Sequence, residues 1–180
     1  AQQRSSGVDF HMVSAEGPGD VAAYVVSTFG TPEVLFDSAD GIDEKEDSVT
    51  LPANAHTHVS WGFSEPGIYK LGFQADGTEV QHLTVAVGVT PPEGMDAIDS
   101  GHLDIEADLA AGAIDLRDQD KRFDPAHTAV SIPSSVLQPI PADPAYRFLG
   151  TPGSDTYLLP QAVLGKHIHG EVDPHLWHNV

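Results

Sequence analysis

The chain has 180 residues, of which 40% are hydrophobic, enough to build a packed core in one domain or two small ones. It carries 27 acidic and 8 basic side chains, a formal net charge of -19, so a nucleic-acid backbone or an anionic membrane surface would repel it. Cysteine is absent, which excludes disulfides and cysteine-ligated zinc, and no apolar run is long enough to insert into a membrane.

The first fifty residues are predicted to form short strands separated by turns. Residues 1–7 are polar and are typical of a linker or a processed end. Alternating apolar residues predict a strand over 8–13. Further strands are predicted over 21–28, around Tyr24, and over 49–51, and the apolar residues 34–36 follow an extended turn at Thr31-Pro32. The intervening loop is acidic and contains Asp37, Asp40, Asp43, Glu44, Glu46 and Asp47. Its spacing lacks the alternating oxygen ligands of a calcium loop, which favours a solvated loop over a calcium site.

Residues 56–89 contain the clearest pattern. On a first strand, one face carries Val59, Trp61 and Phe63, and the other carries His56, His58 and Ser60. Glu65-Pro66-Gly67 ends that strand. On a second strand, the inward positions are Tyr69, Leu71, Phe73 and Ala75. Asp76-Gly77 then predicts a hairpin turn, and residues 80–89 return with their inward positions at Leu83, Val85, Val87 and Val89. An inner Trp and a Tyr after a Pro-Gly corner resemble the immunoglobulin-like sandwich, whose corner Tyr bonds to backbone.

Residues 90–161 form a second block after the Pro91-Pro92 boundary. Alternation predicts a strand over 102–109, a hairpin partner over 113–116 and another strand over 128–132, while 118–124 is charged and predicted to be exposed. An extended segment is expected around Pro133, Pro139, Pro141 and Pro144. Two short apolar anchors follow, at 148–150 and 157–159.

No catalytic constellation is present. Serines lie in turns without a Gly-x-Ser-x-Gly elbow, and no phosphate-binding loop occurs. Paired carboxylates lie on exposed charged stretches, where nothing would separate their pKa values. The chain is therefore not expected to be an enzyme.

Two sets of motifs carry a family resemblance. The segments GPGD (17–20), HTHVSWGFSEPGIY (56–69), GHLD (101–104) and FLG with YLLPQ (148–161) resemble the actinobacterial surface-anchored repeat domain. The ending GKHIHGEVDPHLWHNV resembles the solute-binding proteins of zinc and manganese ABC transporters, whose Asp-Pro-His-aliphatic-Trp segment supplies a metal-ligating His. The matching residue here is His175. Together the motifs resemble anchored-repeat ABC transporter substrate-binding proteins. Because the resemblance includes no second lobe, it implies metal uptake by the parent protein rather than by this piece alone.

Candidate metal ligands are histidines in two regions. His56 and His58 project from one face of a strand, and if His82 lies nearby across Gly72, three imidazoles and a water would make an open zinc site. The alternative is an exposed polar sheet face, and the same two interpretations apply to His102 and Asp104. The tail is His-rich, a compositional signal for metal binding, through His167, His169, His175 and His178. The alternative for the tail is a segment that stays disordered without its parent fold.

These patterns predict an all-β protein. We expect an immunoglobulin-like β-sandwich over residues 1–90, a second packed β unit over 91–161, and an irregular His-rich start of a metal-binding domain over 162–180. The resemblance implies an extracytoplasmic, cell-surface accessory domain that binds or hands over Zn²⁺ or Mn²⁺, with an ABC transporter permease or a cell-envelope protein as its partner. The alternative is an envelope adhesion or scaffolding module that binds a protein or glycan without metal.

Overall fold

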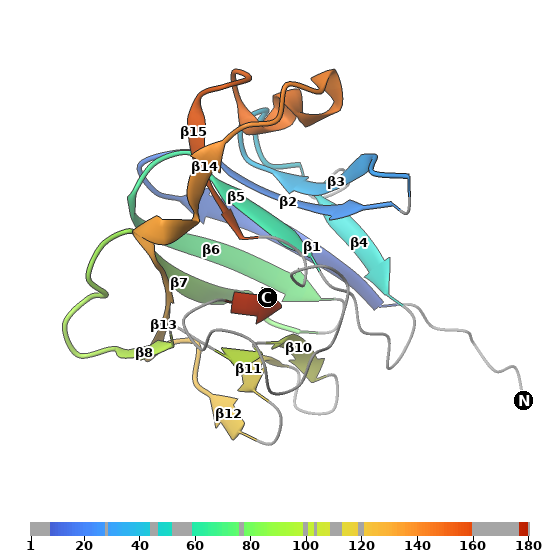
Figure 1. The fold of residues 1–180 in the computed structure, drawn as a ribbon. Coiled ribbons are helices and arrows are strands. Elements are labelled where there is room, and N and C mark those ends of the chain that lie inside the picture. Colours follow the sequence, from blue (N-terminus) through green and yellow to red (C-terminus); the bar gives the residue numbers. More distant parts are fainter. Residues whose placement is uncertain are drawn as a thin grey trace, which may run out of the picture.

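Two large β-sheets packed face to face form the body of the molecule in the computed structural model (Figure 1). The structure describes residues 8–27, 29–43, 47–51, 59–75, 78–98, 101–102, 104–108, 113–118, 121–159 and 177–179. Within these residues the protein is an all-β sandwich, as predicted. No helix in this part of the chain is long and apolar enough to cross a membrane.

The two large sheets draw strands from almost the whole described chain. The six-stranded sheet has the order β4-β1-β6-β7-β13-β8, with bounds β4 (Ser48–Leu51), β1 (Val8–Glu16), β6 (Gly67–Ala75), β7 (Gln81–Val87), β13 (Thr128–Ile132) and β8 (Asp96–Ile98). The five-stranded sheet has the order β14-β15-β5-β2-β3, with bounds β14 (Leu137–Pro139), β15 (Asp155–Leu159), β5 (Ser60–Phe63), β2 (Val21–Val26) and β3 (Pro32–Asp37).

Two small sheets complete the strand inventory. A three-stranded sheet consists of β10 (Asp104–Asp108), β11 (Ala113–Asp118) and β12 (Lys121–Phe123), and a two-stranded one of β9 (Gly101–His102) and β16 (Trp177–Asn179). The predicted hairpin after residue 102 is confirmed by the antiparallel pairing of β10 with β11. The charged stretch that follows contains a strand, β12, in which Lys121 and Arg122 are exposed and Phe123 is half-buried against the core.

The core between the sheets follows the predicted alternation. The inward positions of β6 and the first three of β7 are buried, and the β6–β7 hairpin pairs Tyr69 with Val85 and Leu71 with Leu83. Val89 is the exception: β7 ends at Val87, and Val89 is 40% exposed. Trp61 is only 4% exposed and packs among Phe36, Phe63 and Phe73.

Strands that follow residue 90 complete both large sheets. β13 lies between β7 and β8 and runs parallel to both, and β15 pairs antiparallel with β5. Thr128, Ala129, Val130 and Ile132 are all buried, because a strand with apolar residues on both faces is favoured in the interior of a sheet. The expected division at residue 90 therefore does not separate two sets of sheets.

The proline-rich segment is more compact than the extended chain predicted for it. It contains two short 3-10 helices, η1 (Ser134–Val136) and η2 (Pro144–Leu149). Proline fixes a backbone angle that also suits the first position of a helix, and the Asp143 side chain caps η2 by accepting a hydrogen bond from the Ala145 N–H. Figure 1 shows η2, the orange helix at the top, above the β2–β3 hairpin, on the outer side of the five-stranded sheet.

Candidate functional site

Two of the motifs that carry the family resemblance contact each other at one corner of the sandwich. The Asp20 N–H donates to Ser64 Oγ over 2.7 Å, and the Ser64 N–H donates to the Asp20 carbonyl over 3.0 Å. A Cβ on Gly17 would collide with the Tyr69 ring, and one on Gly67, whose φ is 141°, would lie 2.6 Å from Pro18. The glycines are thus required by close packing between the two turns.

Tyr69 makes the corner hydrogen bond predicted from the sequence. Its hydroxyl donates to the Glu65 carbonyl over 2.6 Å and accepts from the Glu65 N–H over 3.3 Å. Burial raises the pKa of the Tyr69 hydroxyl, so it remains a neutral donor at physiological pH. Trp61 and Tyr69 therefore stabilise the fold.

The strands expected to carry the three-histidine face lie in different sheets. β5, which continues the segment carrying His56 and His58, lies in the five-stranded sheet, whereas His82 is exposed on β7 of the other sheet. His82 does pair with Gly72, but Gly72 has β1 as its second neighbour, and Ser14 Oγ occupies the expected gap, where a side chain at position 72 would project. His56 and His58 themselves lie outside the described residues.

The histidine-bearing segments nevertheless join the sandwich at one place. β5 and β15 are antiparallel neighbours, with Leu159 opposite Trp61. The start of β5 and the end of β15 consequently lie at the same end of the sheet. Residues 52–58 lead into the first of these strands, and residues 160–176 follow the second. His167, His169 and His175 belong to that second stretch and lie outside the described residues.

The last described strand returns to the other predicted histidine pair. β16 runs parallel to β9, with Trp177 opposite Gly101 and Asn179 opposite His102. The backbone around His178 thus lies beside the start of the segment that contains His102 and Asp104. Their side chains are outside the described part of the structure.

The acidic loop is closed by one buried carboxylate rather than being solvated throughout. Asp47 is buried, and its Oδ1 accepts from the Asp37 N–H over 2.8 Å while Oδ2 accepts from the Asp43 N–H over 2.7 Å. Burial, with the charges of Asp40, Asp47 and Asp20, raises the pKa of the Asp37 carboxyl, which the Ala39 N–H partly offsets. Both Asp47 carboxylate oxygens thus accept hydrogen bonds from backbone N–H groups. Among the described residues, no group of three or more His, Asp or Glu side chains could hold a metal ion.

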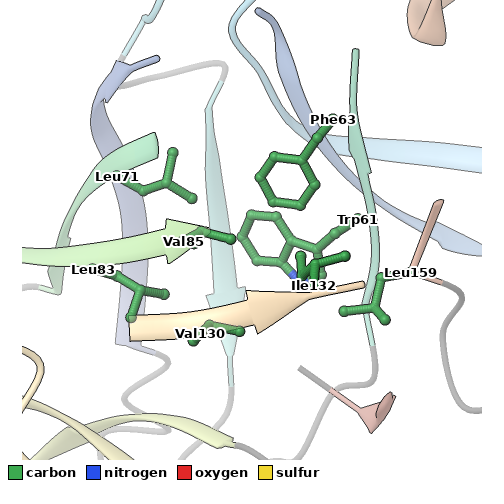
Figure 2. Close-up of a pocket in the computed structure, with 8 residues that line it drawn as sticks. All are labelled: Trp61, Phe63, Leu71, Leu83, Val85, Val130, Ile132 and Leu159. Atoms are coloured by element: carbon green, nitrogen blue, oxygen red, sulfur yellow. The ribbon is translucent and has the colours of Figure 1, made fainter. Parts of the chain in front are cut away.

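A small cavity lies between the sheets next to Trp61. Figure 2 shows its apolar lining, which consists of Trp61, Phe63, Leu71, Leu83, Val85, Val130, Ile132 and Leu159. Its volume is about 10 Å³, and the buried Trp61 Nε1 has no hydrogen-bond partner within the described chain. A buried water is stable only with two to four polar partners, which these side chains do not supply. The cavity is therefore a packing feature of the core and not a ligand site.

The outer face of the five-stranded sheet is covered, although the alternation predicted that its Ser60 face would be solvated. Ser60 is buried beside Tyr24, and Leu149 of η2 packs over Gly62. The centroid of the Tyr24 ring lies 6.0 Å from that of Tyr146 and 5.1 Å from that of Phe148, with interplanar angles of 84° and 70°. Burial, followed by the nearby Tyr146, raises the pKa of Tyr24 to about 12.

An exposed apolar surface continues from this cover along the β2–β3 hairpin. Val26 packs beside the Tyr24 cluster, and Val34, opposite Tyr24 in the register, is 40% exposed. Phe29, at the hairpin tip, is 95% exposed. The hairpin–η2 surface consists of Val26, Phe29, Val34, Tyr146 and Phe148. Sequence reasoning missed it; the signal was Asp143-Pro144, a helix start that brings the next two aromatic residues together.

A comparison of the chain with protein-family models, with curated proteins and with solved structures finds no match.

Proposed function

We propose that the chain is an extracytoplasmic accessory domain of a zinc or manganese ABC transporter substrate-binding protein, and that it binds or hands over these ions. In this proposal the sandwich is a rigid carrier, and the metal ligands lie on the two histidine-bearing segments attached to it. The resemblance of 17–20, 56–69 and the tail to anchored-repeat substrate-binding proteins supports the assignment. The sheet adjacency of β5 and β15 is the structural observation that carries it.

That adjacency supports a site in which both segments contribute ligands. His58 lies two residues before Ser60 at the start of β5, and His167 lies eight residues after Leu159 at the end of β15. An extended chain spans about 3.3 Å per residue, so eight residues reach up to about 26 Å. His56, His58 and either His167 or His169 would supply three imidazoles, the number that leaves one open position on tetrahedral zinc. His175 would then be the ligand contributed from the transporter-like ending.

Calorimetric titration with Zn²⁺ and Mn²⁺ tests this proposal. We expect the wild-type chain to bind, and both the His56→Ala/His58→Ala and the His167→Ala/His169→Ala double variants to lose at least about tenfold in affinity. The matched control is His82→Ala, because His82 is exposed on the opposite sheet. Absence of binding by the wild type, or binding unchanged in both double variants, would refute the proposal.

Acidification provides a second readout. Ligation requires neutral imidazole, whose ordinary pKa is about 6.5, so binding should be lost below about pH 6. If the tail alone supplied the ligands, ordering it would cost about 1 to 2 kcal/mol per residue, and binding would be micromolar or weaker. The His56→Ala/His58→Ala variant separates these cases, because a site confined to the tail would keep its affinity in this variant.

A second candidate is an envelope adhesion or scaffolding module that acts without metal. The hairpin–η2 surface favours it, because the surface is aromatic and protrudes from a domain whose core is already complete. The two candidates are compatible in one molecule, since the histidine segments and this surface are built from different parts of the chain.

A further inference from the structure

The hairpin–η2 surface has the composition of a protein-binding surface. Tyr, Phe and Arg are enriched in protein interfaces, and the surface combines Phe29, Tyr146 and Phe148 with the exposed Arg147. Phe29 is 95% exposed, so it contributes almost nothing to the core that the other aromatic residues build. An aromatic side chain that the core does not use is available to fill a pocket on a partner.

Hydrogen bonds between Ser27, Gly30 and Thr31 brace the β2–β3 hairpin near Phe29. The Ser27 N–H donates to the Thr31 carbonyl over 2.9 Å, and the Gly30 N–H donates to the Ser27 carbonyl over the same distance. The Thr31 N–H also donates to Ser27 Oγ over 3.2 Å. Because these bonds restrict the backbone on both sides of Phe29, its insertion into a partner would cost less conformational entropy than insertion from an unbraced loop.

The neighbouring η2 is equally well fixed. Asp143 caps its start, and Leu149 at its end is buried with Ile140 and Leu158. The centroids of the Tyr146 and Phe148 rings lie 6.2 Å apart with an interplanar angle of 26°, and both rings contact the buried Tyr24. Tyr146 and Phe148 therefore form an aromatic platform that is anchored to the core through Tyr24.

Charge selects the kind of partner. The chain carries a net charge of -19, and at this surface two exposed carboxylates, Glu33 and Asp143, outnumber the one exposed guanidinium, Arg147. A second copy would bring the same excess of negative charge, and an anionic polymer or lipid surface would also be repelled. A basic protein would be attracted at long range, and its apolar residues would meet the aromatic platform at contact.

We propose that the hairpin–η2 surface is a docking site for a protein whose contact region combines an apolar pocket with surrounding Lys or Arg residues. Phe29 fills the pocket, the Tyr146–Phe148 platform packs beside it, and Glu33 and Asp143 face the basic residues. The site is independent of metal, since none of its members is a proposed ligand.

Selection from a random peptide display library tests the proposal without assuming any particular partner. The full chain is the target, and enriched peptides are synthesised and titrated against Phe29→Ser and Val34→Thr. Val80→Ser is the matched control, because Val80 is exposed to a similar degree as Val34 but lies before β7. Phe29→Ser should fold normally, as the Phe29 side chain is almost fully exposed.

We expect enriched peptides that contain an aromatic or long aliphatic residue together with Lys or Arg. Their affinity should fall at least about tenfold for Phe29→Ser, remain within about twofold for Val80→Ser, and weaken as salt is added. Absence of enrichment, peptides without basic residues, or equal binding to Phe29→Ser would each overturn the proposal. A wild-type dimer in sedimentation that Phe29→Ser dissociates would also overturn it, because the occupant would then be a second copy.

Discussion

Replacing Trp61 by Phe should be far less damaging than its central position suggests. Trp61→Ala removes the whole ring from between Phe36, Phe63 and Phe73 and should cost about 3 to 5 kcal/mol. Trp61→Phe keeps most ring contacts and loses about 1 to 2 kcal/mol through reduced burial and a larger cavity. It also removes the buried Nε1–H that lacks a partner, which recovers about 1 to 3 kcal/mol. The two effects should leave Trp61→Phe within about 1 kcal/mol of wild type.

Urea denaturation followed by far-ultraviolet circular dichroism gives the free energies of unfolding, and this signal does not depend on tryptophan fluorescence. Phe73→Leu is the matched control, since it reduces an aromatic side chain in the same core without removing a polar atom. It should cost more than Trp61→Phe. A Trp61→Phe variant as unstable as Trp61→Ala would refute the reasoning, because the indole N–H would then have to be satisfied in the native protein.

Three further changes test local features. Tyr69→Phe removes the hydroxyl that bonds Glu65 and should lower the free energy of unfolding by about 1 kcal/mol, measured by urea denaturation. Asp47→Asn replaces one acceptor by a donor opposite a backbone N–H and should lower the free energy of unfolding by about 2 kcal/mol. Hydrogen exchange at the Asp37 and Asp43 amides should become faster. Unchanged exchange would contradict the proposed closure of the loop. Asp37→Asn should stabilise the protein at pH 7. The pKa of Asp37 is raised in the folded state, so its charged form is disfavoured there. As the pH falls through that pKa, the wild type should therefore gain stability relative to the variant. The difference in stability between the two proteins should vanish below the ordinary pKa of 3.8.

The alternation of apolar residues was sufficient to predict which side chains face the core, but not which strands are neighbours. The inward residues of β6 and the pairing of Gly72 with His82 follow from a hairpin, where connection and adjacency coincide. β5 and β6 are also joined by a tight turn, yet that turn passes from one sheet to the other. Period two defines the face of a strand and contains no information on its partner, so the three-histidine face could not be tested from sequence.

The cover on the outer face of the five-stranded sheet could not be predicted from the sequence, for a different reason. Ser60 and Gly62 alternate with large apolar residues, which is typical of a solvated face. Their burial depends on η2, about ninety residues later, whose prolines are compatible with extended and helical starts alike. The hairpin–η2 surface exists only where these two distant segments meet, so the Asp143-Pro144 signal could predict the aromatic pair of η2 but not the hairpin beside it.

The placement of β13 and β15 also constrains the order in which the protein can fold. Until residues 128–132 are available, β7 has an unpaired edge, and until 155–159 are available, so does β5. The Thr156 hydroxyl even donates to the Phe63 carbonyl across 93 residues of chain. Pairings this distant in sequence form slowly, because the loop entropy is lost before the contacts are gained. A nascent chain should therefore remain open until nearly all of the described residues have been synthesised, and its exposed β5 and β7 edges would be the sites at which it aggregates if it is interrupted.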